Sequence, residues 1–202
     1  MKIIVVGATG VLGQAVAASL RADHEIIEVG LSNGAVNVDI TELESIHNMY
    51  EKIGPFDSLI STTGVVHFGP LEEMTQEQWQ LGLNNKLMGQ INLVTEGLKY
   101  IRDNGSFTLT SGIISKDPIR FGSAAALVNR ALEGFVTCAA LEMPRGVRIN
   151  AVSPTILEES AETFGPYFMG FDPIPASTAA LGFVKSVEGL RNGEIFEIRG
   201  AI

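Results

Sequence analysis

The sequence predicts a doubly wound α/β fold: a parallel sheet between two layers of helices, in one Rossmann-type domain. Three observations predict it. Short apolar runs rich in β-branched residues alternate with longer helical patterns. A glycine-rich turn joins the first run directly to the first helix. The chain has 202 residues, 46% of them hydrophobic, which suits one sizeable core, and we expect a single dinucleotide-binding domain over residues 1–202.

Six of the apolar runs have the length of buried strands. They are Lys2 to Val6, Glu25 to Val29, Asp57 to Ser61, Ser106 to Thr110, Arg148 to Val152 and Glu194 to Ile198. The helical patterns between them are Val11 to Arg21, Glu42 to Lys52, Thr75 to Tyr100, Ser123 to Glu142 and, shorter, Ser177 to Ser186. Because helices separate successive strands, the sheet should be parallel, covered on both faces and connected by right-handed crossovers.

Local signals support some of these boundaries. Thr41 stands three residues before Glu44, the spacing of a capping box, and Gly54 closes the same helix. Cys138 and Trp79 fall in apolar helical patterns, and we interpret both as core residues. The stretch from Pro154 to Pro175 is irregular and predicts a loop over the carboxyl ends of the strands, where ligands bind in such sheets.

Composition excludes several classes of function. The formal net charge is −9, so the average surface repels nucleic acid and anionic lipid, and we expect neither as a partner. A single cysteine allows no internal disulfide and no cysteine-based metal cluster, and we expect no metal site. The first strand follows Met1 at once, which leaves no room for a signal peptide, and we expect a cytoplasmic protein.

The turn after the first strand reads Gly7-Ala8-Thr9-Gly10-Val11-Leu12-Gly13. Its glycines permit a sharp turn, a close approach of the backbone to a pyrophosphate, and packing of the helix on the strand. The N–H groups of the helix then face the phosphates, despite the negative net charge. Three glycines at this spacing can also form nothing more than a tight turn, but the strand before and the helix after favour a dinucleotide site.

Motifs along nearly the whole chain resemble those of the short-chain dehydrogenase/reductase family. Besides the glycine-rich turn, these motifs are Asp39-Ile40, Ser61-Thr62-Thr63-Gly64, Ser111, Ala131-Leu132-Glu133-Gly134-Phe135 and Val147-Arg148-Ile149-Asn150-Ala151-Val152-Ser153-Pro154. The resemblance implies the strand order 3-2-1-4-5-6-7. It also implies an oxidoreductase that uses NAD or NADP with a carbonyl or alcohol, and a homodimer or homotetramer built on the two long central helices.

The dinucleotide is expected to contact the glycine-rich turn and segments that follow later strands. The full set is Gly7, Thr9, Gly10, Val11, Leu12, Gly13, Ser32, Asn33, Asp39, Ile40, Thr62, Thr63, Gly64, Lys86, Asn129 and Pro154. By resemblance, the glycines hold the pyrophosphate, Asp39 and Ile40 border the adenine, and Thr63 and Gly64 lie behind the nicotinamide ribose. Two alternatives remain: Asp39 as a polar residue before a helix, and Thr62 and Thr63 as strand-ending residues.

The sequence departs from the family at the catalytic positions. The family uses a Tyr and a Lys four residues later, where this chain has Ala125 and Asn129, and neither can transfer a proton in that way. Ser111 is retained, and Lys86 stands near the family's Asn. We hypothesise that Lys86 acts as the acid while Ser111 orients the carbonyl. The alternative is that Lys86 is solvated or binds only ribose hydroxyls, and that Asn129 contacts the ribose or is an ordinary buried amide.

The segment after the second strand bears on the choice of dinucleotide. NAD-binding sites usually have an acidic residue there, whereas this chain has Gly30-Leu31-Ser32-Asn33. A 2′-phosphate meets no repulsion, and Ser32 and Asn33 offer hydrogen-bonding groups. The sequence therefore favours NADP(H), with NAD(H) as the alternative.

Three functions compete. The first is hydride transfer between NADP(H) and a small carbonyl or alcohol substrate, with an altered acid/base set. The second is a catalytically inactive dinucleotide-binding sensor or interaction protein, which the missing Tyr and Lys favour. The third, chemistry on a nucleotide-sugar, is disfavoured because little chain follows Pro154 to enclose a large substrate.

Overall fold

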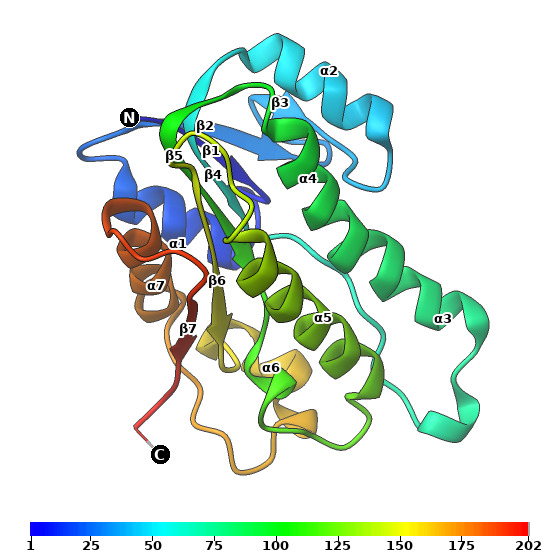
Figure 1. Cartoon of the computed structure of the whole chain (residues 1–202). Helices are drawn as coiled ribbons and strands as arrows, with labels where there is room; N and C mark the ends of the chain where they lie inside the picture. The colour runs from blue at the N-terminus through cyan, green and yellow to red at the C-terminus, as the bar shows by residue number, and fades with distance from the viewer. Residues whose placement is uncertain (202) are drawn as a thin grey trace.

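The computed structural model describes residues 1–201 and contains a seven-stranded sheet in the order β3-β2-β1-β4-β5-β6-β7 (Figure 1). Every neighbouring pair of strands is parallel. The predicted doubly wound fold and its strand order are confirmed. The strands are β1 (Lys2–Val6), β2 (Glu25–Gly30), β3 (Val36–Asn37), β4 (Phe56–Ser61), β5 (Ile101–Thr110), β6 (Arg148–Pro154) and β7 (Ile195–Ile198).

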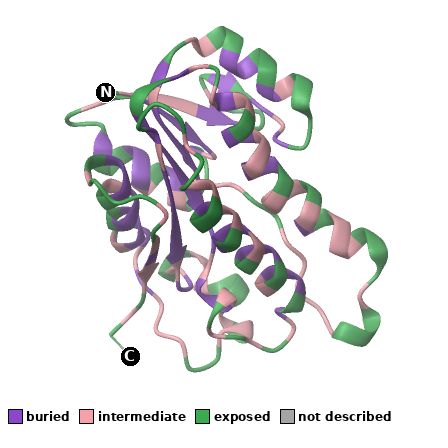
Figure 2. Ribbon diagram, in the orientation of Figure 1, coloured by how far each residue is buried: buried purple, intermediate pink, exposed green. Residues whose placement is uncertain are grey.

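Side chains alternate between the two faces of the sheet, as the two-residue period of a strand requires. In β1, Ile3 and Val5 belong to one core cluster, with side chains of α1 (Val11–Leu20) and α7 (Ala176–Glu188). Ile4 and Val6 belong to a larger cluster that includes residues of α2 (Leu43–Ile53), α4 (Gln90–Gly97) and α5 (Ser123–Ala139). The buried positions follow the strands and the inner sides of these helices (Figure 2). Each face of the sheet is thus covered, and the ends of the strands stay free to form a site.

The main helices agree with the predicted patterns to within a few residues. They are α1 (Val11–Leu20), α2 (Leu43–Ile53), α3 (Gln76–Leu81), α4 (Gln90–Gly97), α5 (Ser123–Ala139) and α7 (Ala176–Glu188). The predicted helix from Thr75 to Tyr100 is interrupted by a π-helical stretch, η2 (Gly82–Gly89), and ends at Gly97, so that β5 begins earlier than expected. Short helical turns are η1 (Leu71–Glu73), η3 (Ile113–Ser115), η4 (Glu158–Ser160), α6 (Ala161–Phe164) and η5 (Gly165–Tyr167).

Three local predictions were wrong. Thr41 does not cap α2: its hydroxyl donates to Asp39 Oδ1 (2.7 Å), and Glu42 takes the N-cap position. The capping box is instead at α3, where Thr75 and Gln78 bond reciprocally.

Two residues predicted to be in the core are not fully buried. Cys138 is exposed on α5, because it does not lie on the buried face of that helix. Trp79 is only partly buried, since α3 extends past the main core. Gly54 ends α2 as expected, with φ +71°.

The segment from Pro154 to Pro175, predicted to be an irregular loop, contains η4, α6 and η5. Its aromatic rings pack against the segment after β4: Tyr167 stacks on Phe68 with centroids 5.4 Å apart, and Phe164 lies 5.9 Å from the same ring. This contact places the segment beside the carboxyl end of the sheet. Across residues 1–201, no helix is both long and apolar enough to span a bilayer.

Candidate functional site

Two cavities lie at the edge where the parallel strands end. The first, of about 470 Å³, follows β1, β2 and β4, and includes Gly7, Leu31, Asp39 and Gly64 in its lining. The second, of about 130 Å³, follows β5 and β6. Gly64 of the first cavity touches Lys86 of the second, since a Cβ on Gly64 would lie 2.3 Å from Lys86 Cγ. The two cavities are therefore neighbours along one edge of the sheet, where doubly wound folds bind ligands.

The glycine-rich turn leaves no room for side chains. Gly7 has φ +87°, and a Cβ there would lie 2.8 Å from Thr62 Oγ1. A Cβ on Gly13 would lie only 2.1 Å from the carbonyl oxygen of Gly7, so α1 packs directly on the turn. The turn is tied to the sheet because the Gly7 and Ala8 N–H groups both donate to Val29 O. This close packing leaves a backbone-lined surface, which suits a pyrophosphate.

The start of α1 lies next to the same cavity. Gly10 is its N-cap, no side chain caps it, and Gly10 and Thr9 both line the cavity. A helix start of this kind offers N–H groups and a positive potential to an anion. Val11 is exposed and Leu12 packs in the core on the α1 side of the sheet, so the predicted contacts of these two residues are through the backbone.

Asp39, Ile40 and Thr41 form another wall of the first cavity. Asp39 Oδ1 accepts from both the N–H and the hydroxyl of Thr41, and these hydrogen bonds lower the pKa of the carboxyl group. Asp39 therefore lines the cavity and orders the chain before α2, whereas its contact with an adenine stays a prediction. Ser32 and Asn33 are exposed and fall outside the lining described for this cavity, whereas Gly30 and Leu31 belong to it.

Thr62, Thr63 and Gly64 continue the cavity after β4. The hydroxyl of Thr62 donates to Val6 O (3.1 Å), and that of Thr63 bonds to Ser61 Oγ (2.7 Å). Gly64 has φ +136°, a conformation that favours glycine, and Asn85 Oδ1 accepts from the next N–H, that of Val65. These hydrogen bonds fix the position of the segment after β4, which lies between the two cavities.

The second cavity is mostly apolar. Its lining includes the six apolar side chains of Val66, Phe68, Ile113, Ile114, Ile156 and Phe168, with Pro154 and Thr155 from the end of β6. The polar side chains of Lys86 and Asn129 enter the same cavity from η2 and α5. Of the predicted site residues, Lys86, Asn129 and Pro154 thus meet here.

Lys86 has an environment that favours its neutral form. Its Nζ donates to the carbonyl oxygen of Ser111 (3.0 Å), and among residues 1–201 no carboxylate lies within ion-pair distance of it. Desolvation lowers the pKa of Lys86 to about 8. The ammonium group of Lys86 is therefore a stronger acid than that of an ordinary lysine. Its side chain also lines the second cavity.

The backbone of Lys86 is held by Gln90, which is fully buried. Gln90 Nε2 donates to Lys86 O (3.1 Å) and Thr110 O (3.0 Å), while its Oε1 accepts from Thr110 N (2.9 Å). The amide therefore joins the π-helical turn to the end of β5. Widened helical turns of this kind are frequent at functional sites. Gln90 was not predicted for the site, although a glutamine on the inner face of a helix is a signal for a structural or functional role.

Ser111 is buried, and its hydroxyl is not directed at the cavity. Ser111 Oγ donates to Glu133 Oε1 (2.8 Å) and to Asn129 O (3.2 Å). Ser115 Oγ also donates to Glu133 Oε1 (2.5 Å), and Arg130 lies 3.5 Å from the other oxygen. Glu133, a buried carboxylate not singled out from the sequence for a role, therefore fixes Ser111. The contact of Ser111 with Lys86 is through its carbonyl oxygen, which accepts from Lys86 Nζ.

Asn129 and Ala125 share the second cavity. Asn129 is 2% exposed, its Nδ2 donates weakly to Gly112 O (3.4 Å), and its Oδ1 is buried without a hydrogen-bond partner among the described residues. A buried acceptor without a donor is costly, and this one belongs to a residue that lines the second cavity. Ala125 presents a methyl group only. No cluster of three potential metal ligands occurs within residues 1–201.

A family model of the short-chain dehydrogenase group, described as enoyl-(acyl carrier protein) reductase, matches residues 7–184. The chain belongs to the short-chain dehydrogenase/reductase family. The curated relatives are distant. Hydroxynaphthalene reductase arp2 of Aspergillus fumigatus is 26% identical over 67% of this chain and 53% of its own length. An uncharacterised oxidoreductase of Methylorubrum extorquens is 22% identical over 98% of this chain and 87% of its own. This short-chain dehydrogenase/reductase thus matches only about half of the fungal enzyme.

The solved structures include a closer match. The protein lin1944 of Listeria innocua is 48% identical, with a TM-score of 0.96 over 98% of this chain and 99% of that one. A small-chain dehydrogenase crystallised in complex with NADPH has the same fold, with a TM-score of 0.89 at 23% identity over 98% of this chain and 96% of that one. The Listeria protein is therefore similar to this chain over nearly the full length of both.

Proposed function

We propose that this short-chain dehydrogenase/reductase transfers hydride between NADP(H) and a small carbonyl or alcohol substrate, with Lys86 as its acid/base group. The observation that carries the proposal is the position of the Lys86 amine. It lies in a small cavity beside the first cavity of about 470 Å³, and desolvation lowers its pKa to about 8. Oxidoreductase relatives and the NADPH complex of a protein with the same fold support the cofactor.

The residues present fit a dinucleotide. The crowded positions at Gly7 and Gly13 leave a backbone surface for the pyrophosphate, next to the uncapped start of α1. Asp39 and Ile40 would border the adenine, and Asn129 Oδ1, buried without a partner among the described residues, would accept a ribose hydroxyl. When bound, the cofactor supplies or accepts the hydride.

Lys86 would donate the proton that a carbonyl oxygen takes up on reduction. Its Nζ is oriented by Ser111 O, and most of the side chains that line the second cavity are apolar. A group whose pKa lies near the working pH is the most effective proton donor. We assign Ser111 a positioning role through its carbonyl oxygen. The Ser111 hydroxyl can orient a substrate only after its hydrogen bond to Glu133 is broken.

The alternative is a dinucleotide-binding sensor without turnover. Ala125 and Asn129, at the positions that the resemblance gives to the family's Tyr and Lys, carry no transferable proton. A screen of small aldehydes and ketones, followed by NADPH absorbance, separates the two functions. Oxidation of NADPH by one of these classes supports the reductase, whereas saturable binding with no turnover across the panel favours the sensor.

Replacing Leu31 with Asp should lower the affinity for NADPH by at least about tenfold and spare that for NADH. Leu31 is exposed, lines the first cavity and follows β2, so a carboxylate there repels a 2′-phosphate. The check is a titration of both proteins with NADPH and NADH, followed by nicotinamide fluorescence and melting temperature. Tighter binding of NADH than of NADPH by the natural chain would contradict the proposed cofactor. Saturation by neither dinucleotide would remove the oxidoreductase proposal.

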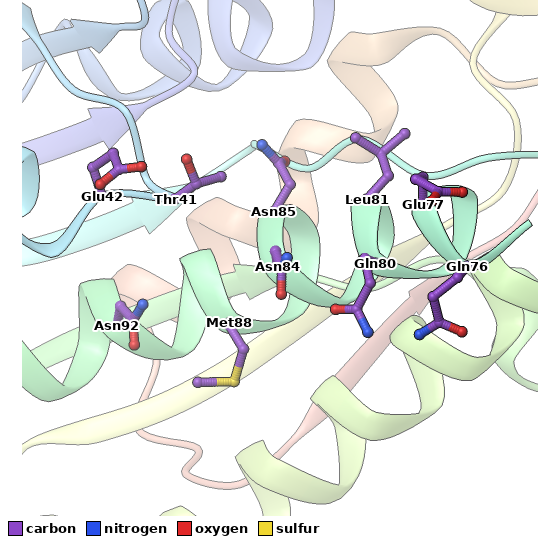
Figure 3. A pocket seen from close by; sticks show the side chains of 10 residues that line it. All are labelled: Thr41, Glu42, Gln76, Glu77, Gln80, Leu81, Asn84, Asn85, Met88 and Asn92. Carbon is purple, nitrogen blue, oxygen red and sulfur yellow. The ribbon is translucent and has the colours of Figure 1, made fainter.

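The family resemblance predicts a homodimer or homotetramer, and we propose that two copies associate through the outer side of the central helices. Leu81 and Met88 line a hollow of about 660 Å³ there, among the amide side chains of Gln76, Gln80 and Asn84 (Figure 3). Leu81, Met88 and, on α5, Leu127 are each at least 40% exposed. Large exposed apolar side chains favour association with a partner.

Leu127→Lys should therefore shift the protein towards the monomer in sedimentation velocity. Leu190→Lys is the matched control, because Leu190 is 93% exposed but follows α7, which covers the opposite face of the sheet. The same change in both variants, or a monomeric natural chain at micromolar concentration, would refute this interface.

A further inference from the structure

Lys86 carries the one charged side chain in the described lining of the second cavity. The rest of that lining is apolar, apart from Asn129, Thr155 and the backbone. Such surroundings screen a charge poorly, so an ammonium group acts strongly on any charge placed beside it. A ligand in this cavity is therefore bound in the presence of a cation that has no counter-ion there.

The acidic groups of the neighbouring elements are engaged elsewhere. On α5, Glu133 binds Ser111 and Ser115 and lies 3.5 Å from Arg130. On α4, Glu96 bonds to His47 and Lys99. Glu77 lies at the exposed start of α3, and Asp39 bonds to Thr41 across the first cavity. On the segment after β6, Glu159 accepts from Ala176 N, and Glu158 and Glu162 are exposed. Desolvation, rather than any of these charges, is what shifts the pKa of Lys86.

The contact between Gly64 and Lys86 joins the two cavities. A dinucleotide with its pyrophosphate at the glycine-rich turn and its adenine at Asp39 would extend past Gly64 towards Lys86. Its nicotinamide end would then lie near this ammonium. The reduced ring is uncharged, whereas the oxidised ring is a cation.

We propose that the ammonium of Lys86 makes the protein discriminate between the two redox forms of the dinucleotide, binding NADPH more tightly than NADP⁺. The proposal rests on the dinucleotide site proposed above, but it does not require turnover. It gives the chain a second function, as a protein whose occupancy follows the reduced fraction of the dinucleotide pool. The missing Tyr and Lys of the family do not affect this function.

The discrimination should depend on pH. Lys86 is protonated below its pKa of about 8, where repulsion weakens NADP⁺ binding, and neutral above it, where the preference fades. By linkage, NADP⁺ must lower the pKa of Lys86 further, so its binding releases a proton near pH 8, and NADPH binding releases less.

The experiment is a binding titration of the natural protein and of Lys86→Met with NADPH, NADP⁺ and the 2′-phosphate of ADP-ribose, which lacks the nicotinamide ring. We expect NADPH to bind at least about tenfold more tightly than NADP⁺ at pH 6.5, and the two affinities to converge by pH 9.5. In Lys86→Met the NADP⁺ affinity should rise to near that of NADPH at both pH values. ADP-ribose 2′-phosphate should bind both proteins equally.

A second variant guards against a disturbed fold. Lys86→Arg keeps a cation at every pH tested, so its preference for NADPH should persist at pH 9.5. Calorimetry of the natural chain in two buffers with different ionisation heats measures the released proton directly. Equal affinities for NADPH and NADP⁺ in the natural chain at pH 6.5, or a preference unchanged in Lys86→Met, overturn the redox discrimination and leave the proposed site standing. Binding of none of the three probes overturns the site itself and the discrimination with it.

Discussion

Lys86→Met is expected to slow reduction of a carbonyl substrate by at least about a hundredfold, because the variant has no group to protonate the developing alkoxide. The methionine side chain keeps most of the length and apolar contacts of the lysine stem, including those to Gly64. NADPH affinity should therefore change by no more than about threefold, because the reduced ring does not interact with the charge. The loss should appear in kcat rather than in cofactor binding.

The measurement is steady-state turnover across pH 6 to 10. In the natural chain kcat should fall as the pH rises through about 8, because the acid must carry its proton before the transfer. Lys99→Met is the control, since Lys99 bonds to Glu96 on the surface and lies outside both cavities. Unchanged turnover in Lys86→Met would exclude the lysine as the proton donor, even if the protein proves to be a reductase.

Gly13→Ala should destabilise the protein by about 3 kcal/mol and reduce NADPH affinity at least tenfold or so. The added Cβ would lie 2.1 Å from Gly7 O and 2.8 Å from Ala8 Cα, both backbone atoms that cannot turn aside. Relief requires α1 to move away from the turn, which spoils the phosphate surface and opens the core. The melting temperature should fall by about 6 to 12 °C.

Gly134→Ala is the matched control for this substitution. Gly134 lies in α5 with nothing within 4 Å of an added Cβ, so the alanine should be neutral or stabilise the helix by up to about 1 kcal/mol. Thermal unfolding and NADPH titration of both variants decide the matter. If Gly13→Ala has the same melting temperature and NADPH affinity as Gly134→Ala, then close packing at the turn does not require a glycine at position 13.

Most of the fold could be predicted from the sequence, because its elements depend on local patterns. The continuous apolar run of β1 and the apolar stripes of α2 and α5 are each visible in a short window. The two-residue strand β3 was missed because Val36–Asn37 is too short to show a hydrophobic period. It is a strand because it pairs with β2, which a local pattern does not reveal. The π-helical stretch was missed because its apolar spacing looks like that of an ordinary helix.

The site was predictable to a lesser extent. The glycine-rich turn could be predicted because a strand precedes it and a helix follows it. Lys86 could be singled out because the resemblance to the family aligns it near a known motif position. The partner of Ser111 could not, because Glu133 is 22 residues away and meets it only after α5 packs on the sheet. The assignment of Thr41 to the cap of α2 was wrong for a different reason: its hydroxyl donates to Asp39, two residues earlier, and this local hydrogen bond competes with the cap.

The buried amide of Gln90 has a consequence for how this family member can change over time. Because it holds the backbone of residue 86, and not its side chain, to the last residue of β5, the scaffold there is independent of what residue 86 carries. Substitutions at position 86 can therefore alter the chemistry of the pocket while the main chain stays where it is. A fold with such a separation between framework and reactive group can acquire or lose an activity in a single mutational step.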